Sequence, residues 1–112
     1  MSKLIYKIKR KFTRGYTNNI NYETLKKIMA ENKNVCLIDV RNRDEYNYKH
    51  IPGAINIPMQ YICARISNYV SDKSNIIILY CQYGGRSAKA LKKLEKMGYS
   101  NLYNLDGGIE AI

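Results

Sequence analysis

One stretch of sequence decides the fold of this chain: Ile76-Ile77-Ile78-Leu79-Tyr80-Cys81-Gln82-Tyr83-Gly84-Gly85-Arg86-Ser87. The apolar run from 76 to 80 predicts a strand covered on both faces, and the pattern from Arg86 or Ser87 onward predicts a helix. The cysteine between them is expected at the carboxyl end of the strand, under the positive end of the helix dipole. Main-chain N–H groups in that position favour a thiolate, the reactive form of cysteine.

The residues after the cysteine suit an anion. We expect Gly84 and Gly85 to let the loop curl tightly, because glycine accepts a positive φ without steric cost. Arg86 adds a permanent positive charge. The loop from Gln82 to Arg86 is therefore expected to cradle an anion that is held on Cys81 or bound to it.

Length and composition limit the alternatives. A chain of 112 residues has room for one domain. Its three cysteines contain no CxxC pair and it has one histidine, so neither a disulfide framework nor a zinc site is expected. No metal or other cofactor is predicted. Free cysteines favour a reducing compartment, and without a long apolar run or a signal-peptide core we predict a cytoplasmic protein.

The positive charge is concentrated at the start of the chain. Residues 1–20 carry six lysines and arginines and no acid, out of a formal net charge of +10. If residues 1–14 are helical, their apolar side chains share one face opposite the lysines. Such a segment would touch an anionic membrane surface or nucleic acid, or would simply pack on the domain or form a tail. We expect a basic N-terminal leader over residues 1–18, with no specific nucleic-acid partner, and a domain over residues 19–112.

Helical and strand patterns alternate along the domain. Asn21 is placed to cap a helix over residues 22–31, and Asn42 and Glu45 have the cap and third-position spacing of a short helix over 42–48. Apolar periods predict further helices over 59–70 and 86–97. Gly107 and Gly108 are expected to permit a tight turn into a last helical turn over 109–112. Apolar runs predict strands over residues 35–40, 76–80 and 101–105, with one short strand within 50–58. This alternation predicts an α/β fold with a central parallel sheet that is flanked by helices on both faces.

Ligands of such sheets bind outside the carboxyl ends of the strands. Asp39 and Arg41 follow one predicted strand and Cys81 follows another, so we expect them on the same side. Asp39 is expected to anchor loops there by hydrogen bonds and Arg41 to help electrostatically. The alternative is that both residues are ordinary solvated charges. Ser87, at the start of the following helix, is assigned a supporting role.

The remaining reactive side chains have plainer interpretations. Cys36 lies in the middle of a predicted strand and is expected in the core. Cys63 lies on a predicted helix, where packing is the favoured interpretation and a resolving or relay thiol is the alternative. His50 precedes Ile-Pro-Gly and is expected to stabilise a turn rather than act as a general base. Cys81 itself would, in the plainest reading, be an ordinary buried cysteine.

Three blocks of sequence together resemble the rhodanese domain family, over roughly residues 19–112. They are Leu37–Arg41 with Glu45-Tyr46 and His50–Pro58, then Cys81–Ser87, then Tyr103–Ala111. The resemblance implies an α/β fold with a parallel sheet and sulfur transfer through a cysteine persulfide. Cys81 matches the catalytic cysteine, and the matched substrate-binding loop consists of Gln82, Tyr83, Gly84, Gly85 and Arg86. Lys49 departs from a glycine that is frequent in the family, and Ile112 stands where the family usually closes its last block with tryptophan.

The implied activity is that of a sulfurtransferase, which moves sulfane sulfur from thiosulfate or a low-molecular-weight persulfide to a thiol or cyanide. Tyr83 would line the mouth of the site. One alternative is a carrier that hands its persulfide to a dedicated sulfur-accepting protein, and another is a regulatory domain without catalysis. A third is a cysteine-dependent phosphatase or arsenate reductase. Four residues separate Cys81 from Arg86, whereas the related dual-specificity phosphatases have five, which favours sulfur over phosphate chemistry.

Overall fold

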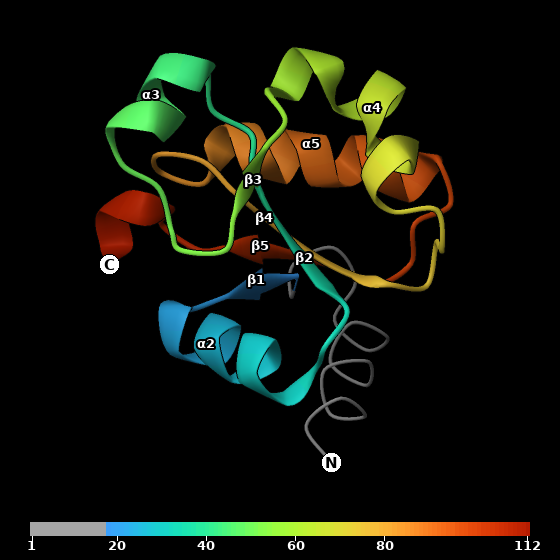
Figure 1. Ribbon diagram of the computed structural model, residues 1–112, viewed down its shortest axis with the longest axis horizontal. Coiled ribbons are helices and arrows are strands. Elements are labelled where there is room, and N and C mark those ends of the chain that lie inside the picture. Colours follow the sequence, from blue (N-terminus) through green and yellow to red (C-terminus); the bar gives the residue numbers. More distant parts are fainter. Residues whose placement is uncertain (1–17) are drawn as a thin grey trace.

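A parallel sheet forms the centre of the protein, of which the computed structural model describes residues 18–112 (Figure 1). Its five strands lie in the order β1-β5-β4-β2-β3, and every neighbouring pair is parallel. The strands are β1 (Asn19–Ile20), β2 (Val35–Asp39), β3 (Ile55–Asn56), β4 (Ile76–Tyr80) and β5 (Leu102–Leu105). The predicted fold class is confirmed.

Helices cover both faces of the sheet. They are α2 (Tyr22–Glu31), α3 (Arg43–Tyr48), α4 (Ile62–Tyr69) and α5 (Gly85–Lys96), with short 3₁₀ turns η1 (Met59–Tyr61) and η2 (Ile109–Ala111). Figure 1 shows α2 on one side of the sheet and α4 and α5 on the other. The carboxyl ends of the strands therefore open towards α3, η2 and the amino-terminal end of α5.

Local capping explains two of these helices. The Asn21 side chain accepts a hydrogen bond from Thr24 N at 2.8 Å and starts α2. Asn42 and Glu45 form a reciprocal capping box at α3, with distances of 2.9 and 3.0 Å. Both caps were predicted from the sequence and are confirmed.

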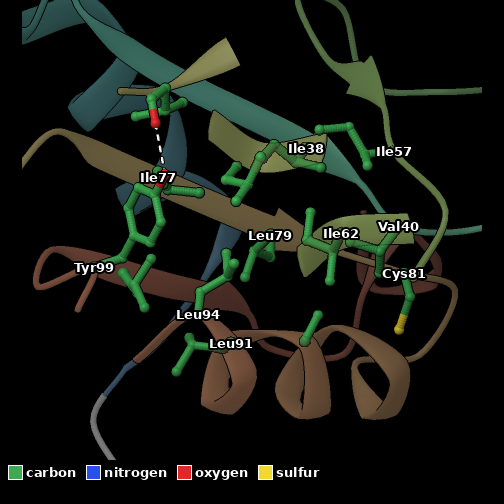
Figure 2. Packing of buried hydrophobic residues seen from close by; sticks show 14 residues of the cluster. Ile38, Val40, Ile57, Ile62, Ile77, Leu79, Cys81, Leu91, Leu94 and Tyr99 are labelled. Atoms are coloured by element: carbon green, nitrogen blue, oxygen red, sulfur yellow. Dashed lines mark hydrogen bonds between the residues drawn. The ribbon is translucent and has the colours of Figure 1, made fainter. Parts of the chain in front are cut away.

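Every residue of β4 is buried, and its side chains alternate between two cores. Ile76, Ile78 and Tyr80 pack on the α2 side, whereas Ile77 and Leu79 pack on the side of α4 and α5. Cys81 continues this alternation and belongs to the cluster on the side of α4 and α5 (Figure 2). The period of two along the strand thus aims the cysteine side chain at α5.

Two details differ from the sequence prediction. β1 was not predicted, because two residues carry no periodic signal; it is held by pairing with β5, and the Asn18 side chain donates to Leu102 O at 2.9 Å. The helix expected over 59–70 is interrupted, since η1 precedes α4. Met59 N donates to Val40 O at 2.9 Å, which ties the start of this segment to the end of β2.

The predicted basic leader falls almost wholly on residues 1–17, outside the described residues, and it stays a prediction. No helix among residues 18–112 combines the length and apolar character that crossing a membrane requires. Within that same range, no group of three or more histidine, cysteine, aspartate or glutamate side chains is arranged to hold a metal ion.

Candidate active site

Cys81 is the first residue after β4, and its sulfur is surrounded by hydrogen-bond donors. Gly84 N lies 3.1 Å from Sγ, Ser87 N lies 3.4 Å from it and the Ser87 hydroxyl lies 3.3 Å from it. These donors come from the loop and the first turn of α5. The residue is buried, with 2% of its surface exposed. The expected placement of a thiol beneath main-chain N–H groups is confirmed.

The surroundings of the sulfur favour its ionised form. Burial raises the pKa of the Cys81 thiol, but hydrogen bonds from the side chain and backbone of Ser87 and from the backbones of Gly84 and Tyr83 lower it by more. The net result is a pKa below the ordinary value of a cysteine. A thiolate at this position is both stabilised and nucleophilic.

The two loop glycines have different roles. Gly84 is the N-cap of α5 and has a φ of +107°, a left-handed conformation that other residues rarely adopt. Gly85 is the first residue of α5 and does not have a positive φ. A Cβ added to Gly85 would meet no heavy atom within 4 Å. The expectation that a positive φ at both glycines lets the loop curl is therefore wrong for Gly85.

The turn η2 near the carboxyl terminus is hydrogen-bonded to the cysteine loop. Ile109 N donates to Cys81 O at 3.0 Å, and Glu110 N donates to Gln82 O at 3.1 Å. The Gln82 side-chain amide also donates to the Glu110 carboxylate. A Cβ on Gly108 would lie 2.3 Å from Gln82 O, so only glycine permits this approach. The sequence predicted a tight turn at this glycine but gave no sign of its contact with the cysteine loop.

Arg86 is engaged with Glu45 of α3. Its Nη1 lies 2.9 Å from Glu45 Oε1 and its Nη2 lies 3.1 Å from Oε2, a two-pronged pair that is partly exposed. The hydrogen bond from Arg86 is the main cause of a lowered pKa for the Glu45 carboxyl. Sequence reasoning assigned Glu45 only to helix capping and missed this pair. The positive charge expected to face an anion is thus largely compensated.

Asp39 and Arg41 form a buried ion pair beside the loop. Asp39 is fully buried, and its carboxylate accepts from Arg41 N at 2.9 Å, from Nε at 3.0 Å and from Nη2 at 2.8 Å. Arg41 then reaches two loops, donating to Gln82 Oε1 at 3.0 Å and to Lys49 O at 2.6 Å. Solvated charges, the alternative interpretation of these residues, are excluded by this burial.

The departure at Lys49 is accommodated without strain. Its φ of −164° is extended backbone, which any residue adopts, so the frequent glycine is not required here. The neighbouring His50 stacks on the Tyr46 ring, with centroids 3.8 Å apart. The His50 Nδ1 also lies 2.8 Å from Tyr46 O. These contacts agree with the expected turn-stabilising role.

The other two cysteines differ from Cys81. Cys36 is half-buried on β2, and burial raises the pKa of its thiol to about 11, which keeps it protonated. Cys63 is exposed, because Ile62 and Ile66 occupy the buried side of α4. The favoured packing interpretation of Cys63 is therefore wrong, and its role as a relay thiol stays a prediction. Tyr83 is 73% exposed on the loop.

The comparison with protein families agrees with this geometry. The model of the rhodanese-like domain matches residues 21–112, which include the sheet, the cysteine loop and the carboxyl-terminal turn. This chain belongs to the rhodanese-like domain family. The resemblance drawn from the three sequence blocks is confirmed.

Two relatives of this rhodanese-like domain are named as sulfurtransferases. A sulfurtransferase of Allochromatium vinosum is 36% identical over 94 residues, which cover 84% of this chain and 86% of the relative. The thiosulfate sulfurtransferase PspE of Escherichia coli is 40% identical over 70 residues, covering 62% of this chain and 67% of PspE. These relatives support a sulfurtransferase activity in general.

Solved structures show the same fold. A rhodanese-like domain protein from Staphylococcus aureus superposes with a TM-score of 0.73 and 34% identity, covering 83% of this chain and 88% of the other. A rhodanese from E. coli, solved with anions, gives a TM-score of 0.65 and 37% identity and covers 70% of this chain and 91% of the other.

Proposed function

We propose that the protein is a sulfurtransferase that carries sulfane sulfur as a persulfide on Cys81. The proposed donor is thiosulfate or a low-molecular-weight persulfide, and the proposed acceptor is a thiol, or cyanide in the test tube. The observation that carries the proposal is the set of donors around the Cys81 sulfur at 3.1 to 3.4 Å, together with the lowered pKa of the thiol. An ordinary buried cysteine has no such surroundings.

In the first step the Cys81 thiolate attacks the outer sulfur of thiosulfate. A bond forms between the Cys81 sulfur and that outer sulfur, and the bond to the central sulfur breaks. The electron pair leaves with sulfite, so the site keeps a persulfide anion. With the anion of an organic persulfide as donor, the leaving group is the thiolate, and the site again keeps a persulfide anion. No general base is needed if the thiolate is already populated, and the lowered pKa of the Cys81 thiol favours that form.

In the second step an acceptor takes the outer sulfur. An acceptor thiolate attacks it, the bond to the Cys81 sulfur breaks and the Cys81 thiolate is regenerated while a new persulfide departs. Cyanide in the same role leaves as thiocyanate. The two half-reactions share one covalent intermediate and need no oxidant, reductant or further cofactor.

Each loop residue has a proposed role in these steps. The N–H groups from Gln82 to Arg86 would cradle the persulfide, and Arg86 would stabilise the charge of an anionic donor or leaving group. Ser87 would hold the Cys81 thiolate through its hydroxyl. Tyr83, exposed at the mouth, would influence which donor enters. Asp39 and Arg41 would support the loop through Gln82.

A second candidate function is a carrier that serves a dedicated sulfur-accepting protein and turns over free thiosulfate poorly. The pairing of Arg86 with Glu45 favours it, because a dianionic donor meets a compensated charge at the mouth. We also propose a cytoplasmic location, since free thiols persist in reducing compartments. The predicted contact of the basic leader with an anionic surface remains a separate proposal.

Mass spectrometry of the intact protein after exposure to thiosulfate tests the proposal. The wild type should gain the mass of one sulfur atom, Cys81→Ser should gain nothing, and Cys63→Ser should behave as the wild type. Cyanide should then release thiocyanate and restore the original mass. Loading without efficient turnover would favour the dedicated carrier. If no sulfane donor loads the wild type, the proposed function is wrong.

A further inference from the structure

Asn104 is a buried polar residue that the steps proposed above do not use. It lies in β5, and 4% of its surface is exposed. Its Nδ2 lies 2.9 Å from Asn19 Oδ1 and 3.4 Å from Gly84 O. A carbonyl oxygen can only accept, so the side-chain atom facing Gly84 is the nitrogen, and both of its hydrogens are donated. Asn104 therefore links the edge strand β1 to the cysteine loop.

The side-chain oxygen of Asn104 gains nothing from its position. Its Oδ1 is buried and has no hydrogen-bond partner among residues 18–112. A buried polar atom without a partner costs free energy, and an apolar side chain of the same shape avoids that cost. Leucine has nearly that shape and occupies the buried positions 102 and 105 of the same strand. The stability of the fold alone therefore does not account for an asparagine here.

The carbonyl that Asn104 contacts belongs to the left-handed residue of the loop. Gly84 has a φ of +107°, and its N–H lies 3.1 Å from the Cys81 sulfur. The Gly84 carbonyl also accepts from Ala88 N at 3.1 Å and lies 3.2 Å from the Ser87 hydroxyl. Both of these partners belong to α5, whereas Asn104 approaches the same carbonyl from the sheet. Gly84 is thus fixed between the helix and the sheet.

We propose that Asn104 is a positioning residue of the sulfur-transfer site, which holds the Gly84 carbonyl from the sheet and so keeps the Gly84 N–H on the Cys81 sulfur. The inference rests on the proposed function, because it concerns the same sulfur. Asn104 acts only through Gly84, so its effect is smaller than that of a direct donor. Loss of a direct donor would raise the pH at which the thiolate forms by about one unit or more. Loosening one donor should raise it by about half a unit.

Asn104→Leu tests the proposal, with Asn101→Leu as the matched control. Asn101 is equally buried and has an unpaired Oδ1, but its Nδ2 lies 3.4 Å from Ser74 O, before the start of β4. In Asn104→Leu, the midpoint of the pH–rate profile for alkylation of Cys81 by iodoacetamide should rise by about half a pH unit. Urea denaturation should show no loss of stability, because the α5 partners of the Gly84 carbonyl remain. An unchanged midpoint, or an equal rise in Asn101→Leu, would overturn the proposal.

The wild-type protein provides a test that does not depend on the folding of a variant. In ¹⁵N-labelled protein, the side-chain amide of Asn104 and the backbone amide of Gly84 should shift with one midpoint, that of Cys81 ionisation. The side-chain amide of Asn101 should not shift with it. An Asn104 amide that does not respond to this ionisation would overturn the proposal.

The same spectra distinguish placement of one donor from a general disturbance of the loop. In Asn104→Leu, the shift of the Gly84 amide on ionisation should become smaller, while the Ser87 amide keeps its wild-type response. Equal losses at both amides would refute a role through Gly84. These measurements need no sulfur donor, so they are independent of the proposed function. If no sulfane donor loads Cys81, the sulfurtransferase is refuted, and the effect of Asn104 on the thiolate stands or falls by the alkylation and the spectra alone.

Discussion

Replacing Ser87 with alanine is expected to raise the pKa of the Cys81 thiol, because it removes the hydroxyl that donates to the sulfur at 3.3 Å. The backbone donors of Ser87 and Gly84 remain in place. A hydrogen bond to a charged group contributes about 1.5–3 kcal/mol. This one belongs at the lower end, since the same hydroxyl also lies 3.2 Å from Gly84 O. A loss of about 1.5 kcal/mol lowers the thiolate population roughly tenfold at any pH well below the pKa of the Cys81 thiol.

The effect on reactivity is smaller than the effect on ionisation. A thiolate of higher pKa is a better nucleophile, so each remaining thiolate of Ser87→Ala should react about threefold faster. The two effects together predict that alkylation of Cys81 by iodoacetamide slows about threefold at a pH well below the pKa of the wild-type thiol. The midpoint of its pH–rate profile should move to higher pH.

Peptide mass spectrometry can follow the alkylation of each cysteine separately. The exposed Cys63 serves as an internal reference in the same sample, and Ser67→Ala, which removes an exposed hydroxyl of α4, is the matched control. Both should keep the wild-type behaviour. A faster reaction of Cys81 at an unchanged midpoint would reflect easier access to the buried sulfur. That result, or an unchanged profile, would refute the role assigned to the Ser87 hydroxyl.

The loop, the ion pair and the thiolate give three further predictions. Gly84→Ala should reduce sulfur transfer at least about tenfold and destabilise the fold by about 1 kcal/mol or more, because the φ of Gly84 is +107°. Gly85→Ala should keep wild-type activity and stability. Equal effects of the two substitutions on kinetics and thermal denaturation would contradict this. Glu45→Gln keeps a capping side chain but frees Arg86, so KM for thiosulfate should fall about threefold in steady-state assays while urea denaturation changes little; an unchanged or higher KM would count against it. The folded state lowers the pKa of Cys81 below the unfolded value of about 8.5, so the thiolate stabilises the fold above that value and the contribution is lost as pH falls through the folded pKa. Urea denaturation should show the stability of the wild type relative to Cys81→Ser rising with pH across that window, and a flat difference would argue against the lowered pKa.

The pairing of Arg86 with Glu45 affects which anions the site attracts. Glu45 both caps α3 and holds Arg86, so the charge at the mouth depends on the placement of a neighbouring helix. A carboxylate that pairs with the loop arginine lowers the attraction for small dianions. It has less effect on ligands that make contacts elsewhere.

Local sequence determined the element that carries the cysteine. The apolar run of β4, the glycine at position 84 and the amphipathic pattern of α5 act over neighbouring residues, so strand, loop and helix could all be predicted. The alternation of side chains along a strand then directs Cys81 towards α5. Asn21 and Asn42 were likewise readable as caps, because a cap needs only a residue three positions away.

The tertiary structure decided what surrounds that cysteine. Arg86 and Glu45 are 41 residues apart in sequence, as are Arg41 and Gln82, and no local pattern pairs them. β1 exists only because the edge of β5 offers it hydrogen bonds, and Gly108 is required only because a carboxyl-terminal turn packs on Gln82. Neighbouring residues determine backbone conformation and periodicity. The partner of a charged side chain depends instead on which strand ends and loops the sheet brings together. The placement of Cys81 among hydrogen-bond donors could therefore be predicted from the sequence, but the net charge beside it could not.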